Sequence, residues 1–126
     1  QLKPMARIVS FATGSLDPRY FGEAPVIGIG MALKKAGLTI DQMDLIECNE
    51  AFAVQTISVA RQVKWDESRL NVNGGAIALG HALGATGGRL MTTLLYELQK
   101  RNGKYGLATA CTGGGMGVAT IVENLR

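Results

Sequence analysis

The stretch Leu45-Ile46-Glu47-Cys48-Asn49-Glu50-Ala51-Phe52 decides the fold class, because two kinds of element meet in it. Residues 45–48 are short and apolar, which predicts a buried strand. Residues 50–63 then predict a helix, because apolar or small side chains recur on one helical face at Phe52, Thr56, Val59 and Val63. A strand that passes directly into a helix is typical of an α/β domain.

The same alternation continues on both sides of this stretch. We expect further strands over residues 6–13, 70–73, 105–111 and 118–122, and further helices over 25–36 and 83–100. The order βαβαβαββ predicts a three-layer α/β domain with a mixed, mostly parallel five-stranded sheet. The last two strands should pair antiparallel across a tight glycine turn. We find no repeat and no linker, so residues 1–126 are predicted to form one domain.

Composition restricts the kinds of partner. Hydrophobic residues make up 47% of the 126 residues and charged residues 18%, which is typical of a globular domain. The net charge is only +3 and the basic residues are scattered, so no nucleic-acid surface is predicted. No apolar run approaches the ~20 residues that span a bilayer, so no membrane partner is expected. A single histidine and no paired cysteine spacing argue against a metal site.

Two further features bear on context. The two cysteines, Cys48 and Cys111, fit a reducing compartment better than a disulfide scaffold, so we expect a cytoplasmic location. The chain begins Gln1-Leu2-Lys3-Pro4, without an initiator methionine or a signal-peptide pattern. We therefore expect it to be part of a longer protein.

His81 is the first candidate for chemistry. It lies in Gly80-His81-Ala82-Leu83-Gly84, between a predicted strand and a predicted helix. A histidine is suited to proton transfer near neutral pH, and flanking glycines allow a substrate to come close. A core or surface histidine with satisfied hydrogen bonds is about equally compatible with the residue type alone.

Cys111 is the second candidate. A cysteine at the end of an apolar strand is usually a small buried hydrophobic residue, and we interpret Cys48 in that way. Cys111 differs because Gly113, Gly114, Gly115 and Gly117 follow it, and backbone N–H groups in such a turn can bind an oxyanion. A thiol beside these donors could act as a nucleophile or a proton carrier.

Two other patterns are weaker. Asn49 and Glu50 open a predicted helix, where asparagine is a good N-cap and glutamate favours the helix dipole. The glycine-rich run over residues 74–88 lacks both the Gly-Lys-Ser/Thr end of a P-loop and a dinucleotide fingerprint. Phe52 and Met116 are, by residue type, more often packing residues than ligand contacts.

Three blocks together resemble the thiolase family, over residues 2–123. They are Asn49-Glu50-Ala51-Phe52-Ala53, then Asn73-Gly74-Gly75-Ala76-Ile77-Ala78-Leu79-Gly80-His81, and then Cys111-Thr112-Gly113-Gly114-Gly115-Met116-Gly117. The resemblance implies the C-terminal domain of an acetyl-CoA acetyltransferase-type thiolase. Its activity would be acyl transfer between acyl-CoA thioesters, either Claisen condensation or thiolysis. Coenzyme A thioesters would be substrates, with no permanently bound cofactor.

The resemblance also implies roles for individual residues. His81 would activate a nucleophilic cysteine of the N-terminal half and help to hold a thioester oxyanion, and Cys111 would shuttle the proton of the substrate methyl group. Asn49 would anchor a water in one oxyanion hole, and Gly113 would supply a backbone N–H to the other. Phe52 would line the pantetheine pocket, while Phe21 and Met116 would bear on the acyl pocket.

This sequence departs from the family in several places. Ala82 stands where proline commonly follows the histidine, and Thr112 where an apolar residue often follows the cysteine. No segment resembles the block that carries the nucleophile. We therefore expect the chain alone to be inactive and to need an N-terminal thiolase half, within a complete enzyme that forms a homo-oligomer. The alternatives are half of a ketosynthase-like condensing enzyme and a non-catalytic acyl-CoA-binding or assembly module.

Overall fold

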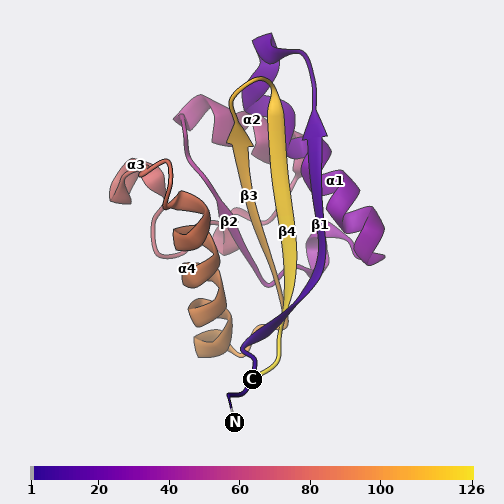
Figure 1. The fold of residues 1–126 in the computed structure, drawn as a ribbon, viewed down its shortest axis with the longest axis vertical. Coiled ribbons are helices and arrows are strands. Elements are labelled where there is room, and N and C mark those ends of the chain that lie inside the picture. The colour runs from indigo at the N-terminus through magenta and orange to yellow at the C-terminus, as the bar shows by residue number, and fades with distance from the viewer. Residues whose placement is uncertain (1) are drawn as a thin grey trace.

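A twisted sheet lies between helices on both of its faces (Figure 1). The computed structural model describes residues 2–126. The sheet has four strands in the order β1-β4-β3-β2, and these strands are β1 (Ala6–Ser15), β2 (Leu45–Cys48), β3 (Tyr105–Thr112) and β4 (Met116–Asn124). The α-helices are α1 (Ala24–Ala36), α2 (Ala53–Val63), α3 (Ala76–Leu79) and α4 (Thr86–Arg101). Short 3-10 helices η1 (Pro18–Glu23), η2 (Ile40–Gln42) and η3 (Glu67–Arg69) lie in the connections.

Two hydrophobic cores form, one on each face of the sheet. On the first face, Ile29 from α1 and Val59 from α2 pack against Ile46, Leu107 and Ile121 of the strands. On the opposite face, α4 buries its leucine stripe against the sheet, and this core contains Leu45, Leu90, Leu94, Leu98, Ala108 and Val122. The predicted three-layer α/β architecture is confirmed. Within residues 2–126, no helix has the length and apolar character needed to cross a membrane.

Strand pairing corrects part of the predicted sheet. The sheet is mixed, as expected, but only β2 and β3 pair in parallel. β4 returns from β3 across the glycine turn as an antiparallel hairpin strand, and β1 pairs antiparallel with its other edge. The prediction of a mostly parallel sheet is therefore wrong, because the hairpin strand lies between β1 and β3.

The fifth strand, predicted over residues 70–73, does not form. Leu70 makes a single parallel bridge with Ile46, and the backbone of Asn71 then turns into the left-handed region with φ of 43°. The Asn71 side chain takes the place of a strand, because its Oδ1 accepts from the Cys48 N–H at 2.9 Å and its Nδ2 donates to the Cys48 carbonyl at 2.9 Å. An asparagine tolerates this conformation better than most residues, which explains why the chain turns here.

The helices differ from the sequence predictions mainly at their starts. α1 ends as predicted, with Gly37 in the left-handed conformation at φ of 66°. α2 begins at Ala53 rather than at Glu50, so Asn49 is not its N-cap. Asn49 instead extends the sheet, since its N–H donates to the Thr109 carbonyl at 2.9 Å. α4 begins at Thr86, which leaves Leu83 outside the helix and exposed.

Candidate active site

Three segments meet at the end of the sheet where the parallel pair β2 and β3 terminates. They are the segment after β2, the loop that precedes α4, and the glycine turn after β3. Between them lies a cleft of about 450 Å³. Six residues predicted from the sequence line this cleft, and they are Phe21, Asn49, Phe52, His81, Cys111 and Gly113. Met116 does not line it, and lies on β4 opposite Thr112.

Asn49 is held at the floor of the cleft and is 1% exposed. Its backbone is fixed by Thr109, while its Nδ2 lies 3.5 Å from Nε2 of His81. The side-chain Oδ1 is buried and has no hydrogen-bond partner among residues 2–126. A buried amide oxygen without a partner is costly, so this atom is suited to accept a hydrogen bond from a bound molecule.

His81 is held at both ring nitrogens. Its Nδ1 lies 2.7 Å from Oγ1 of Thr86, and its Nε2 lies 3.5 Å from the Asn49 amide nitrogen. An amide nitrogen can only donate, so the network assigns Nε2 as an acceptor and places the hydrogen on Nδ1. The unprotonated nitrogen of His81 therefore lies on the Asn49 side of the ring, where the imidazole can accept a proton from a reacting group.

The two cysteines have different surroundings, as the sequence analysis predicted for Cys48. Cys48 is fully buried in the core of the first face, and burial raises the pKa of its thiol to about 12. Cys111 lies near the end of β3, is partly exposed, and lines the cleft. Burial raises the pKa of the Cys111 thiol as well, so at neutral pH this group is predominantly a thiol rather than a thiolate.

The turn over residues 113–115 brings backbone to the edge of the cleft. Gly114 and Gly115 have φ angles of 84° and 83°, which favour glycine. A side chain at Gly115 would also collide with the carbonyl oxygen of Leu16, and the Leu16 N–H donates to the Gly115 carbonyl at 2.9 Å. Gly113 is exposed and lines the cleft directly.

Reasoning from the sequence missed two residues that orient parts of this cleft. Thr86 is buried beneath the imidazole of His81 and lines the same cleft. Glu50 ties the segment after β2 to the loop that carries His81, because it accepts from Asn71 Nδ2 at 2.8 Å and from the Ile77 N–H at 3.0 Å. Thr86 and Glu50 are both residue types that occur at helix starts, so the sequence pattern did not indicate these longer-range contacts.

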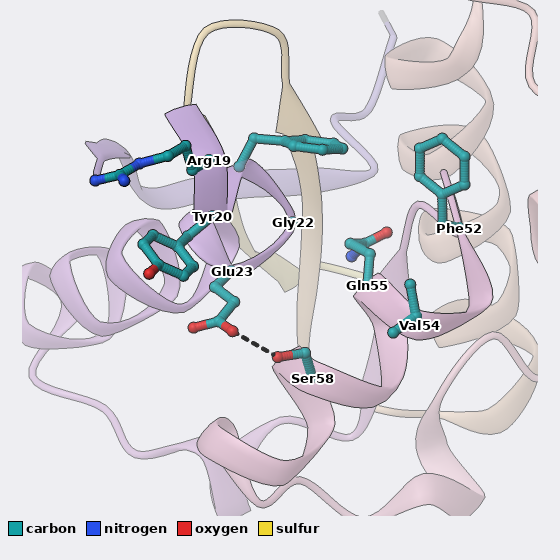
Figure 2. A pocket seen from close by; sticks show the side chains of 9 residues that line it. Arg19, Tyr20, Gly22, Glu23, Phe52, Val54, Gln55 and Ser58 are labelled. Carbon is teal, nitrogen blue, oxygen red and sulfur yellow. Dashed lines mark hydrogen bonds between the residues drawn. The ribbon is translucent and has the colours of Figure 1, made fainter. Parts of the chain in front are cut away.

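A second, smaller cleft of about 230 Å³ adjoins the first and lies between η1 and α2 (Figure 2). Phe21 and Phe52 line both clefts. Glu23, at the end of η1, holds this part of α2 in place, because it accepts from Ser58 Oγ at 3.1 Å and from Gln62 Nε2 at 3.0 Å.

A buried ion pair lies under the first turns of α4. Arg89 Nη1 lies 3.6 Å from Oε2 of Glu47, whose side chain is 3% exposed. Burial raises the pKa of Glu47 to about 7, although the charge of Arg89 acts in the opposite direction. Glu47 is two residues before Asn49 on the chain, and Arg89 is three residues after Thr86 on α4, so the pair is adjacent to the site.

The fold and cleft together define an α/β domain with a histidine, a half-buried cysteine and a buried asparagine at one end of its sheet. The description "Thiolase, C-terminal domain" matches residues 2–124. The chain therefore belongs to the family of thiolase C-terminal domains.

Named relatives agree with this assignment. The chain is 58% identical to an acetyl-CoA acetyltransferase of Syntrophomonas wolfei and 56% identical to one of Allochromatium vinosum, each over 98% of the chain. Among solved structures, human mitochondrial 3-ketoacyl-CoA thiolase superposes with a TM-score of 0.96 at 50% identity, again over 98% of the chain. The chain spans about 32% of the length of each of these three proteins.

Proposed function

We propose that this domain is the C-terminal catalytic domain of a thiolase of the acetyl-CoA acetyltransferase type, which transfers acyl groups between coenzyme A thioesters. The observation that carries this proposal is the convergence of His81, Cys111 and Asn49 on one cleft. Family membership and the names of the relatives support it. One related structure, human mitochondrial 3-ketoacyl-CoA thiolase, was determined in complex with CoA.

In the proposed reaction, a cysteine of an N-terminal thiolase half attacks an acyl-CoA thioester. His81 Nε2 accepts the proton of that thiol, a new thioester forms on the cysteine as the carbon–sulfur bond to coenzyme A breaks, and Cys111 gives its proton to the departing coenzyme A thiolate. The Cys111 thiolate then takes a proton from the methyl group of acetyl-CoA, and the resulting enolate attacks the acyl carbon. A carbon–carbon bond forms, the carbon–sulfur bond to the nucleophilic cysteine breaks, and the departing cysteine thiolate takes back its proton from His81. Thiolysis is the reverse sequence.

The enolate is the difficult species, because a thioester methyl group is a very weak acid. Preorganised hydrogen-bond donors are the main means by which enzymes stabilise such oxyanions. We assign this task to Asn49, through a water that it would anchor, and to protonated His81, while the backbone N–H of Gly113 would belong to the second oxyanion hole. The Asn49 side chain is buried and its backbone is fixed by the hydrogen bond to Thr109, which supports this role because the group needs little reorganisation during the reaction.

Cys111 is proposed to carry the proton to and from the substrate carbon. Its raised pKa supports this role over that of a nucleophile, because the thiol form is the one that donates a proton. Phe52 is proposed to contact the pantetheine arm, and Phe21 the acyl group. Met116 is also proposed to bear on the acyl pocket, although it does not line the cleft of this domain. A homo-oligomeric complete enzyme and a cytoplasmic location stay predictions.

A chimera provides the test. The chain would replace the corresponding 126 residues of the Syntrophomonas wolfei acetyl-CoA acetyltransferase, to which it is 58% identical. We expect the chimera to cleave acetoacetyl-CoA with coenzyme A, and the 126-residue chain alone to show no cleavage. His81→Ala should lower turnover of the chimera by about 10²–10⁴-fold, as for other lost acid/base groups. A folded chimera without activity would favour the non-catalytic alternative, and near-normal turnover of His81→Ala would remove the acid/base role.

A further inference from the structure

The Thr86 hydroxyl contacts the His81 imidazole, but Thr86 has no part in the proposed mechanism. Thr86 is the first residue of α4 and is 5% exposed, and its hydroxyl oxygen lies within hydrogen-bond distance of the His81 imidazole. We propose that the Thr86 hydroxyl is a positioning residue, which fixes the tautomer and orientation of His81 and supports the imidazolium formed during acyl transfer. The inference rests on the proposed function, in which His81 is the acid/base group.

The hydrogen-bond chain has a defined direction. The Thr86 hydroxyl donates its single hydrogen to the Ala82 carbonyl at 2.9 Å. Its oxygen is therefore available as an acceptor for Nδ1–H of His81, which lies 2.7 Å away. Asn49 Nδ2 donates toward the opposite nitrogen at 3.5 Å, so both ends of the network specify the same tautomer.

This arrangement matters most after proton transfer. When Nε2 accepts a proton, the ring becomes positively charged, and the bond from Nδ1 to Thr86 becomes a hydrogen bond from a charged donor. Such bonds are stronger than neutral ones. Thr86 thus stabilises the protonated ring more than the neutral ring, and it does so without contact with the reacting atoms.

The location of Thr86 explains how its hydroxyl stays in place. The residue lies at the first position of α4, and its backbone N–H also donates to the Ala82 carbonyl, at 2.8 Å. The loop between His81 and Thr86 is therefore closed by both the backbone and the side chain of Thr86. Glycine and alanine fill most of this loop, and no proline stiffens it. Because this backbone is less rigid, the position of the His81 ring depends more on the hydrogen bond between His81 Nδ1 and the Thr86 hydroxyl.

The test compares substitutions at one position in the chimera. Thr86→Ala and Thr86→Ser both remove a methyl group, but only serine keeps the hydroxyl. We expect Thr86→Ala to lower kcat for acetoacetyl-CoA thiolysis by on the order of ten- to a hundredfold, the range for a lost hydrogen bond to a charged group. KM should change far less, and the acidic limb of the pH–rate profile should move to lower pH. Thr86→Ser should restore both the rate and the profile.

Thr92→Val provides the matched control, because Thr92 is an exposed threonine on the same helix, outside both clefts. It should leave kcat and the pH profile unchanged. Equal loss of kcat in Thr86→Ala and Thr86→Ser would overturn the inference, since it would attribute the effect to packing. An unshifted acidic limb in Thr86→Ala would overturn it as well. Activity of the unsubstituted chimera tests the proposed function separately, because only the comparison among Thr86 variants bears on Thr86.

Discussion

The ring of Phe21, from η1, meets the ring of Phe52, which precedes α2, edge to face with centroids 6.2 Å apart and planes at 78°. The pair lies between the cleft that contains His81 and the smaller cleft shown in Figure 2. Phe52 is still 58% exposed, so much of its ring is free to contact a bound molecule. Edge-to-face pairs are favourable beyond the area that they bury, so each ring helps to hold the other in place.

Replacing one ring of this pair should weaken substrate binding. We expect Phe52→Ala in the chimera to raise KM for acetoacetyl-CoA by about tenfold or more, since burying a phenylalanine side chain contributes about 1.5–3 kcal/mol. Steady-state kinetics would measure the change, and Val54→Ala is the control because this neighbour is exposed and outside the main cleft. Equal effects of the two substitutions would contradict direct contact between Phe52 and the substrate.

The two cysteines of this chain should react at different rates with iodoacetamide. The alkylation rate depends on access and on the thiolate fraction. Cys48 is fully buried and burial raises the pKa of its thiol to about 12, whereas Cys111 is partly exposed at the cleft. Mass spectrometry of the labelled chimera should find Cys111 modified first, at a rate that still increases above the ordinary thiol pKa of ~8.5. Earlier labelling of Cys48 would contradict the assignment.

Cys111→Ala should in addition impair condensation more than acylation of the nucleophile.

Glu47 should make the stability of the domain depend on pH. Its pKa is about 7 in the folded protein and near the ordinary value of 4.5 when unfolded, so between these values the folded state binds more protons. The contribution of Glu47 to the free energy of unfolding is therefore greatest below pH 4.5 and is lost as pH rises towards 7. The loss is at most about 1.4 kcal/mol per pH unit.

Glu47→Gln isolates this contribution. The melting temperature of the unsubstituted chimera should fall relative to that of Glu47→Gln as pH rises from about 4.5 to about 7. The exposed Glu67→Gln, measured over the same range, provides the background. If the difference in melting temperature between the unsubstituted chimera and Glu47→Gln does not change with pH, the Glu47 carboxyl has the same pKa in the folded and unfolded states.

Two glycines of α1 should respond to alanine in opposite ways. A Cβ at Gly28 would lie 2.8 Å from the Gly117 carbonyl oxygen on β4, whereas a Cβ at Gly30 would meet nothing within 4 Å. Gly28→Ala should destabilise the domain by about 1–3 kcal/mol through overpacking. Gly30→Ala should stabilise it by up to about 1 kcal/mol, because alanine favours a helix. Melting temperatures of the two variants would show this contrast, and a shift of the same sign would contradict the packing of α1 on the sheet.

Local sequence patterns were enough for the three layers, for the four strands that form and for the three longer helices, but they did not predict α3. Leucine spacing and a glycine after a helix are signals that operate within one or two turns, so α1 formed close to its predicted bounds and α4 formed from Thr86 rather than from residue 83. Strand neighbours depend on the whole chain, which explains the error in the sheet. The sequence of residues 116–124 contains no signal that predicts the position of this strand between β1 and β3.

The same distinction applies to the site. The positions of Asn49 and Cys111 at the ends of strands followed from the element pattern, whereas His81 followed from the thiolase blocks, because it lies between α3 and α4 rather than after a strand. The residues that orient these side chains could not be predicted in this way. Thr86 reaches His81 across a loop, and Asn71 reaches Cys48 across 23 residues, so these contacts depend on backbone turns that no periodicity reveals.

The Asn71 contact also has a consequence for solubility. Strands at the margin of a sheet carry backbone groups that can recruit strands of other molecules, and unprotected margins promote aggregation. On β2, the Ile46 carbonyl accepts from the Asn71 N–H at 2.8 Å, and the Asn71 amide occupies both backbone groups of Cys48. One residue, through its backbone N–H and its side chain, thus blocks intermolecular strand addition next to the residues that we assign to catalysis, without the length of chain that a further strand would need.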